Sequence, residues 1–323
     1  MVKLKVGLLI RIIFLFCGVF LAHLTQAQQD AQLTQYMYNG LFYNPAFAGK
    51  DAGFGFSALH RSQWMNYTGS NGPAPLTQVL SASGRVDKLK TGFGVTFVND
   101  QIGVTKNQEL NLSVAYHKRM RRGVLSLGAY GGMFSSTIRF DELNFVNPET
   151  QIPLAGDETQ MNINFGAGAI YDRGNFYMGL SSRHINQPGF DFGDGAIDNT
   201  LNNHSYLLVG YRIKTFAQWT FDPSLLVKSV SFNNFSYDLS VIATHDQKIS
   251  AGFAYRWQES LSVLLGYSLL SDNSLSLHYA FDAVMSGVKA KAPTSHEFML
   301  RYRLMPSTRE VKRVIQRTPR FRF

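Results

Sequence analysis

Apolar and polar side chains alternate with a period of two through most of the chain after residue 50. The pattern is clearest at Ile249, Ala251, Phe253, Tyr255 and Trp257, which are separated by polar or small residues. This alternation is typical of a β-strand with one apolar face. Each such run has about ten residues, the length that a tilted strand needs to cross a bilayer. No segment after residue 27 shows the period of an amphipathic helix.

Counting these runs predicts about 14 antiparallel strands, an even number as in single-chain bacterial outer-membrane barrels. The predicted strands start near residues 51, 75, 91, 107, 122, 160, 174, 203, 217, 234, 247, 259, 272 and 294. Long connections alternate with short turns, as they do when long loops face outward and short turns face the periplasm. The long connections are at 61–74, 135–159, 184–202 and 282–293. One short hairpin, near Gln258, breaks the alternation.

A soluble β-sandwich gives long and short loops no reason to alternate, so we expect an all-β transmembrane outer-membrane barrel over residues 50–306. Composition agrees, because the mean hydropathy is only −0.09 although 45% of the residues are hydrophobic. A bundle of membrane helices would need several unbroken apolar runs of about 20 residues. Aromatic residues make up 13% of the chain and charged residues only 16%, which favours strands with aromatic girdles facing lipid.

Residues 1–27 are expected to be a signal peptide. Basic residues precede an apolar stretch from Ile12 to Leu21, and Thr25-Gln26-Ala27 offers a cleavage site. An uncleaved N-terminal anchor helix is the alternative. Cys17 is the only cysteine, so the mature chain would have neither disulfides nor thiolate chemistry.

The basic character of the chain belongs to its ends. The formal net charge is +9, and it falls to +6 without the three bases of the signal peptide. Residues 307–323 contain six bases and one acid, so we expect a basic periplasmic tail there. Residues 28–306 carry only +1, which gives no basic face for nucleic acid.

The segment 28–49 is the most distinctive part of the mature chain. It places Tyr36, Asn39, Asn44, Pro45 and Gly49 among further aromatic residues. The Asn-Pro and Ala-Gly elements indicate turns, whereas the aromatic side chains need a surface to bury against. We expect either a plug inside the barrel, whose lumen would otherwise be wet, or a periplasmic arm on its rim.

Titratable residues give no candidate active site, and we expect no catalytic residue, cofactor or metal. The histidines expected on strands share no spacing: His117, His204, His278 and His296. Nothing in the sequence pairs one of them with a serine and an orienting partner as in a hydrolase, and no run has metal-ligand spacing. Asp246, Asp272 and Asp282 are expected in turns, where aspartate bonds to local backbone.

Two glycine pairs, Gly92-Phe-Gly94 and Gly166-Ala-Gly168, lie in predicted strands. Neither opens a helix, so neither is a dinucleotide-binding fingerprint. Glycine within a strand instead indicates close approach of another backbone, or curvature.

The N-terminal motifs, followed in order by motifs along the strands, resemble the PorP/SprF family of type IX secretion membrane proteins of Bacteroidetes. The motifs are Gln29-Asp30, Gln35-Tyr36-Met37, Asn44-Pro45-Ala46-Phe47-Ala48-Gly49, Arg61-Ser-Gln63-Trp64, Asn99-Asp100-Gln-Ile-Gly103, Ser181-Ser-Arg-His184, Phe221-Asp-Pro223-Ser224 and Ser295-His296-Glu297. The chain departs from the family pattern at Gly40, where proline is common, and in its long basic tail.

This resemblance implies a non-enzymatic outer-membrane component that assists export or surface retention of a cargo protein, in some bacteria a gliding adhesin. It implies as partners the secreted cargo, periplasmic and lipoprotein components of the machine, and outer-membrane lipid, with both termini periplasmic. The alternative is an outer-membrane porin for small solutes, which would need an open lumen with charged constriction residues.

Overall fold

The computed structural model describes residues 30–51, 53–65, 73–142, 156–193, 197–215, 218–285 and 294–304. Fourteen long strands form one antiparallel sheet: β1 (Phe54–Ser62), β2 (Leu76–Val86), β3 (Thr91–Ile102), β4 (Thr105–Met120), β5 (Gly123–Arg139), β6 (Asp157–Arg173), β7 (Phe176–Arg183), β10 (His204–Tyr211), β12 (Trp219–Val230), β13 (Asn234–His245), β14 (Ile249–Arg256), β15 (Ser260–Ser268), β16 (Leu275–Val284) and β17 (Thr294–Leu304). A short strand, β11 (Ile213–Lys214), pairs with β12.

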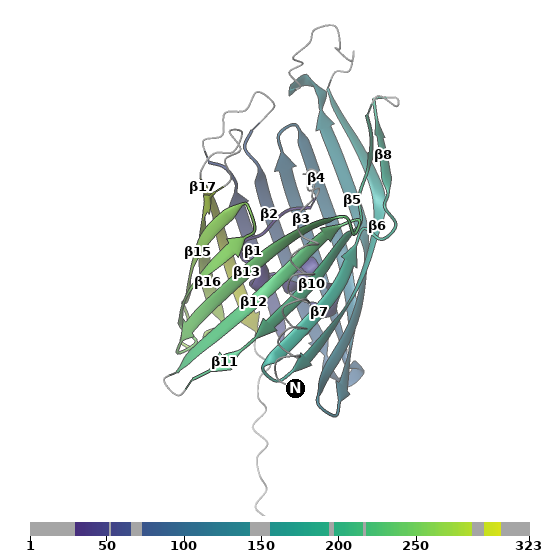
Figure 1. Cartoon of the computed structure of the whole chain (residues 1–323). Helices are drawn as coiled ribbons and strands as arrows, with labels where there is room; N and C mark the ends of the chain where they lie inside the picture. Colours follow the sequence, from purple (N-terminus) through teal and green to yellow (C-terminus); the bar gives the residue numbers. More distant parts are fainter. Residues whose placement is uncertain are drawn as a thin grey trace, which may run out of the picture.

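The sheet closes on itself. Each long strand pairs with its sequence neighbours, β10 pairs with β12, and β1 pairs with β17 in register from Phe54–Leu304 to Ser62–His296 (Figure 1). Closure leaves the long strands no free edge. The predicted fourteen-strand barrel is confirmed, and every predicted strand start lies within three residues of the observed one.

The two faces of the sheet differ as the sequence pattern predicts, with polar residues inside. On β4 the outward residues Leu110, Leu112, Val114 and Tyr116 are exposed, whereas the alternate positions 109, 111, 113, 115 and 117 are buried. A water-soluble sheet would bury the apolar face instead. An apolar outer wall around a polar interior is the arrangement of a barrel that faces lipid.

The long connections all join strands at the same end of the barrel (Figure 1). We call the end with the β5–β6 and β7–β10 connections the loop end, and the other end, where β1 begins and β17 finishes, the turn end. The prediction of a single short exception at the loop end is wrong. Three connections there are tight, namely Gly103–Val104, Ser231–Asn233 and Trp257–Glu259. Positive φ angles at Gly103, Ser231 and Gln258 allow these reversals.

Strands β5 and β6 are each 17 residues long and form a tall wall that rises above β7 at the loop end (Figure 1). A hairpin of β8 (Gly189–Phe192) and β9 (Ile197–Thr200) packs against this tall wall. Its Phe190 and Phe192 share a buried cluster with Phe134, Ile138 and Phe140. Beyond the apolar belt the outward positions of the wall turn polar, for example Thr137 and Thr159. The alternation of apolar and polar side chains therefore ends before β5 and β6 do. For this reason the observed connection between the two strands is shorter than the one predicted at 135–159.

Before β1, a purple segment in Figure 1 runs inside the barrel. We call residues 30–50 the luminal segment. It contains η1 (Tyr36–Tyr38), α2 (Gly40–Tyr43) and η2 (Pro45–Phe47). None of the helices in the described residues is long and apolar enough to cross a bilayer. The expected signal peptide, residues 28–29 and the tail 307–323 lie outside the described residues.

Candidate functional site

The luminal segment packs against inward side chains from both sides of the barrel. Its Leu33, Tyr36, Phe42 and Tyr43 belong to one buried apolar cluster. The remaining members come from β1, β2, β3, β10, β12 and β17: Leu59, Val79, Val98, Tyr206, Leu208, Leu226 and Met299. The lumen of this barrel therefore holds a packed core in which the segment takes part.

Buried ion pairs surround the first residues of the segment. We call their eight strand-borne charged residues the ionic collar: Arg61, Glu109, Arg183, Lys228, Asp238, Arg256, Asp282 and Glu297. The collar contains four cations and four carboxylates, so its formal charges cancel. Charges this deeply buried are tolerated only when they are paired and hydrogen-bonded.

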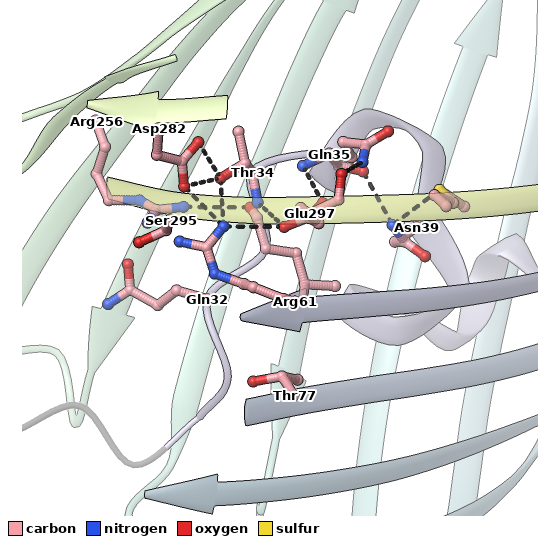
Figure 2. Close-up of polar contacts among 12 residues, drawn as sticks. Gln32, Thr34, Gln35, Asn39, Arg61, Thr77, Arg256, Asp282, Ser295 and Glu297 are labelled. Carbon is pink, nitrogen blue, oxygen red and sulfur yellow. Dashed lines mark hydrogen bonds and ion pairs between the residues drawn. The ribbon is translucent and has the colours of Figure 1, made fainter. Parts of the chain in front are cut away.

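The first cluster of the collar holds residues 34 and 35 of the segment (Figure 2). Arg61 Nη1 lies 2.7 Å from Asp282 Oδ2 and 3.1 Å from Glu297 Oε2. Glu297 accepts the backbone N–H of Thr34 at 2.8 Å through Oε2 and that of Gln35 at 2.9 Å through Oε1. Thr34 Oγ1 donates to Asp282 Oδ2 at 2.8 Å and accepts from Arg61 Nη1 at 2.8 Å. One carboxylate thus fixes two consecutive backbone amides in the lumen.

The second cluster holds Asp30. Its Oδ2 accepts from Arg183 Nη1 at 2.9 Å and from the Tyr206 hydroxyl at 2.7 Å, while Oδ1 lies 2.9 Å from His184 Nε2. Arg183 also pairs with Glu109 on β4. Burial by itself would raise the pKa of Asp30, but the Arg183 guanidinium and the neighbouring histidines hold that pKa well below its usual range. Asp30 is therefore ionised at neutral pH.

The third cluster contacts residues 32 and 33. Asp238 lies 2.9 Å from Lys228 Nζ and 3.2 Å from Arg256 Nε. Lys228 also donates to Gln32 Oε1 at 3.2 Å, and Arg256 Nη2 donates to the Leu33 carbonyl at 3.3 Å. All three clusters of the collar therefore bond directly to residues 30–35.

Three side chains that could each bind a metal ion lie close together, although their spacing in the sequence did not predict this. Asp30, His184 and His204 bring one potential ligand atom each to within 4.8 Å of the others. Both Asp30 oxygens are already engaged, one of them by the Arg183 guanidinium. A fixed cation bound to the same carboxylate opposes a metal ion, so we interpret this group as a hydrogen-bonded ion network.

Tyr36 and Asn39, singled out in the sequence, lie in the middle of the segment. The Tyr36 hydroxyl bridges β12 and β13, at 3.0 Å from Ser224 Oγ and 2.9 Å from Ser240 Oγ. Burial raises the pKa of Tyr36, so the hydroxyl keeps its proton for these bonds. Asn39 Nδ2 donates to the Gln35 carbonyl at 3.0 Å and closes the turn around η1.

Asn44 and Pro45 fix the next turn and attach it to the wall. The Asn44 side chain accepts from the Ala46 N–H at 2.9 Å, which caps η2, and Pro45 occupies its first position. Asn44 Nδ2 also donates to the carbonyls of Ala169 on β6 and Leu180 on β7, at 3.2 and 3.0 Å. One side chain therefore links the cap to two strands.

Glycines on the strands make room for residues 44–48 of the luminal segment. A Cβ on Gly92 would lie 2.0 Å from the Ala48 carbonyl oxygen, and one on Gly128 would lie 2.4 Å from the Ala46 nitrogen. A Cβ on Gly168 would lie 2.2 Å from Asn44 Oδ1. Of the two explanations predicted for strand glycines, close backbone approach is confirmed at Gly92, whereas Gly168 makes room for the Asn44 side chain. Gly49, with φ of +62°, makes the turn that leads toward β1.

Sequence reasoning missed the ionic collar, and it placed Asp282 wrongly. Asp282 is buried on β16 and pairs with Arg61, because the strand continues to Val284. Asp246 and Asp272 do lie in turns, as predicted. The available signal was the polar half of the alternation, in which inward positions such as Glu109, Asp238 and Glu297 carry charges.

Solved outer-membrane barrels resemble this fold at low identity. The toluene transporter TbuX of Ralstonia pickettii is 12% identical, with a TM-score of 0.49, over 82% of this chain and 93% of that protein. Omp33 of Acinetobacter baumannii is 8% identical, with a TM-score of 0.45, over 79% and 100%. The translocator domain of autotransporter NalP from Neisseria meningitidis is 11% identical, with a TM-score of 0.43, over 84% and 93%. Likeness at this level leaves function to be argued from the chain itself.

No curated protein matches the chain. A family model does: the one described as type IX secretion system membrane protein PorP/SprF matches residues 25–302. The match spans the luminal segment and nearly all of the barrel.

Proposed function

The chain belongs to the PorP/SprF family of type IX secretion system membrane proteins, and from this premise we propose that it is an accessory outer-membrane barrel that holds a secreted cargo protein at the cell surface. The observation that carries this proposal is the luminal segment. Residues 30–50 occupy the lumen and bond to strands around it, so the cargo would dock on the barrel and not pass through it.

The alternative, a porin for small solutes, is less well supported. A porin lumen is filled with water and lined by charged residues that set its selectivity. Here the charged residues of the ionic collar pair with one another and with the segment. Such a barrel would act as a plugged scaffold.

We propose the tall wall and the β8–β9 hairpin as the surface that contacts cargo. Loops carry binding functions because a rigid scaffold positions them. The hairpin is anchored by the buried cluster of Phe134, Ile138, Phe140, Phe190, Phe192 and Leu201. Polar bonds add to this, with Asn162 Nδ2 donating to the Gly189 carbonyl at 2.7 Å and Gly193 N to Glu158 Oε2 at 2.8 Å. The hairpin thus forms a fixed outer platform. A gliding-type adhesin is one candidate cargo.

Replacing residues 189–200 by a short Gly/Ser linker tests this assignment. In a strain lacking the native gene, we expect the variant barrel to reach the outer membrane but leave its cargo cell-associated or degraded, the same outcome that we expect for the gene deletion. The measurement is the distribution of cargo between cell surface, medium and cell pellet. The control inserts the same linker after Asn233, in the tight β12–β13 turn at the same end, and should retain cargo display. Normal display with the hairpin replaced would contradict the proposed surface.

Membership of the family implies association with other components of the secretion machine. We propose that the turn end and the basic tail 307–323 face the periplasm, where periplasmic and lipoprotein components would be in reach. This role involves no enzyme chemistry.

A further inference from the structure

Cationic side chains gather on two neighbouring turns at the turn end. We call them the basic-turn patch: Arg85, Lys88 and Lys90 around the β2–β3 turn, and Lys118, Arg119, Arg121 and Arg122 around the β4–β5 turn. The turns lie side by side, because His117 N donates to the Lys90 carbonyl at 2.8 Å where β3 pairs with β4. In Figure 1 the β4–β5 hairpin reaches down past the neighbouring turns.

Few acidic residues balance the positive charge of the basic-turn patch. Its one acid, Asp87, pairs with Arg85 at 2.7 Å. The other six cations are exposed, and none forms an ion pair within the described residues. Elsewhere at this end acids accompany bases, as where Lys50 pairs with Asp172 at 3.1 Å, or where Asp246 shares a turn with Lys248. Six like charges on two adjoining turns create a local positive field that favours an anionic ligand.

Exposed apolar side chains are interleaved with these cations. Leu89 is 61% exposed between Lys88 and Lys90, and Met120 is 46% exposed between Arg119 and Arg121. The same strands carry exposed Phe93 and Tyr116 of the apolar belt directly above the turns. A solvated charged face or a site for an acidic protein has no need of isolated leucine and methionine side chains in water. The boundary between acyl chains and headgroups accommodates both kinds of side chain at once.

We propose that the basic-turn patch binds the phosphate groups of anionic phospholipids in the inner leaflet, with Leu89 and Met120 entering the acyl region. The lysine and arginine side chains donate to headgroup phosphates, and arginine does so in bidentate fashion. Because the cations occupy only one side of the barrel, bound anionic lipid concentrates beside β2–β5. The proposal does not depend on the cargo-holding role.

Native mass spectrometry of the full mature protein tests the proposal, with titration of phosphatidylglycerol or phosphatidylcholine in mild detergent. The test variant is Lys88→Gln, Lys90→Gln, Arg121→Gln and Arg122→Gln, all at exposed turn positions. We expect the wild type to prefer phosphatidylglycerol, and the variant to lose about tenfold or more in apparent affinity for it, since each basic residue near a surface adds to anionic lipid binding. Rising salt should weaken the wild-type preference.

The matched control is Lys214→Gln with Lys248→Gln, two exposed cations at the same end, on the short strand β11 and in the β13–β14 turn. It should change phosphatidylglycerol affinity by less than about twofold. Equal binding of the two lipids by the wild type would overturn the proposal. So would retention of phosphatidylglycerol by the test variant together with loss of a periplasmic protein in pull-down, which would assign the patch to an acidic protein.

Discussion

At the scale of single residues, buried carboxylates hold backbone amides of the luminal segment inside the barrel. Glu297 is the clearest case, because it accepts from Thr34 N and Gln35 N and also faces Arg61. Replacing Glu297 with glutamine removes the charge and leaves Arg61 with one carboxylate fewer. Breaking a buried ion pair in this way costs about 3–5 kcal/mol. We expect a correspondingly lower free energy of unfolding, measured by urea titration of the folded, fast-migrating form in detergent.

The control for this prediction is Glu142→Gln. Glu142 pairs with Arg139 at 2.6 Å but is 40% exposed, so its loss should cost less than about 1 kcal/mol. Equal unfolding midpoints for the two variants would mean that Glu297 does not hold the luminal segment.

The structure of the luminal segment was predictable from the sequence in part. The Asn-Pro turn signal correctly indicated a tight structure at Asn44 and Pro45, because its chemistry is local. The bonds from Asn44 to β6 and β7 were not predictable, since they join residues more than a hundred positions apart. The same holds for the pairing of Arg61 with Asp282 and Glu297, whose partners only barrel closure brings together.

At the scale of elements, the luminal segment packs closely against the strands because strand glycines leave space for the backbone of the segment. Gly128→Val should force η2 away from β5, because even a Cβ there would meet Ala46 N at 2.4 Å. Overpacking of this kind costs about 1–3 kcal/mol, enough to raise the open population of the segment about tenfold. The measurement is maleimide labelling of Ala48→Cys, a fully buried position in a mature chain expected to hold no other cysteine.

Gly131→Val on the same strand is the matched control, since its nearest neighbour is a Phe165 ring carbon at 3.5 Å. It should leave the labelling rate unchanged. If the control labels faster, or if Gly128→Val does not raise the labelling rate, the strand glycines do not position the luminal segment.

Strand positions were more predictable than connections. Alternation along β13–β17 follows directly from one lipid-facing and one luminal side. It fades on β5 and β6 above the apolar belt, where outward residues such as Thr137 and Thr159 are polar. The β8–β9 hairpin was not predicted as strand, because each of its strands has only four residues and its burial comes from the wall.

At the scale of the whole molecule, the chain is an outer-membrane barrel whose own N-terminal segment occupies the lumen. The sequence left plug and rim arm open, since period-two patterning reports the wall and says nothing of what lies inside it. The bonds between the ionic collar and residues 30–35 support the plug that we propose.

The most direct test of this central claim is the conductance of the purified mature protein in a planar lipid bilayer. With residues 30–50 seated in the lumen, we expect insertion without a steady open current. A stable, large conductance from the unmodified protein would contradict the account and favour a porin.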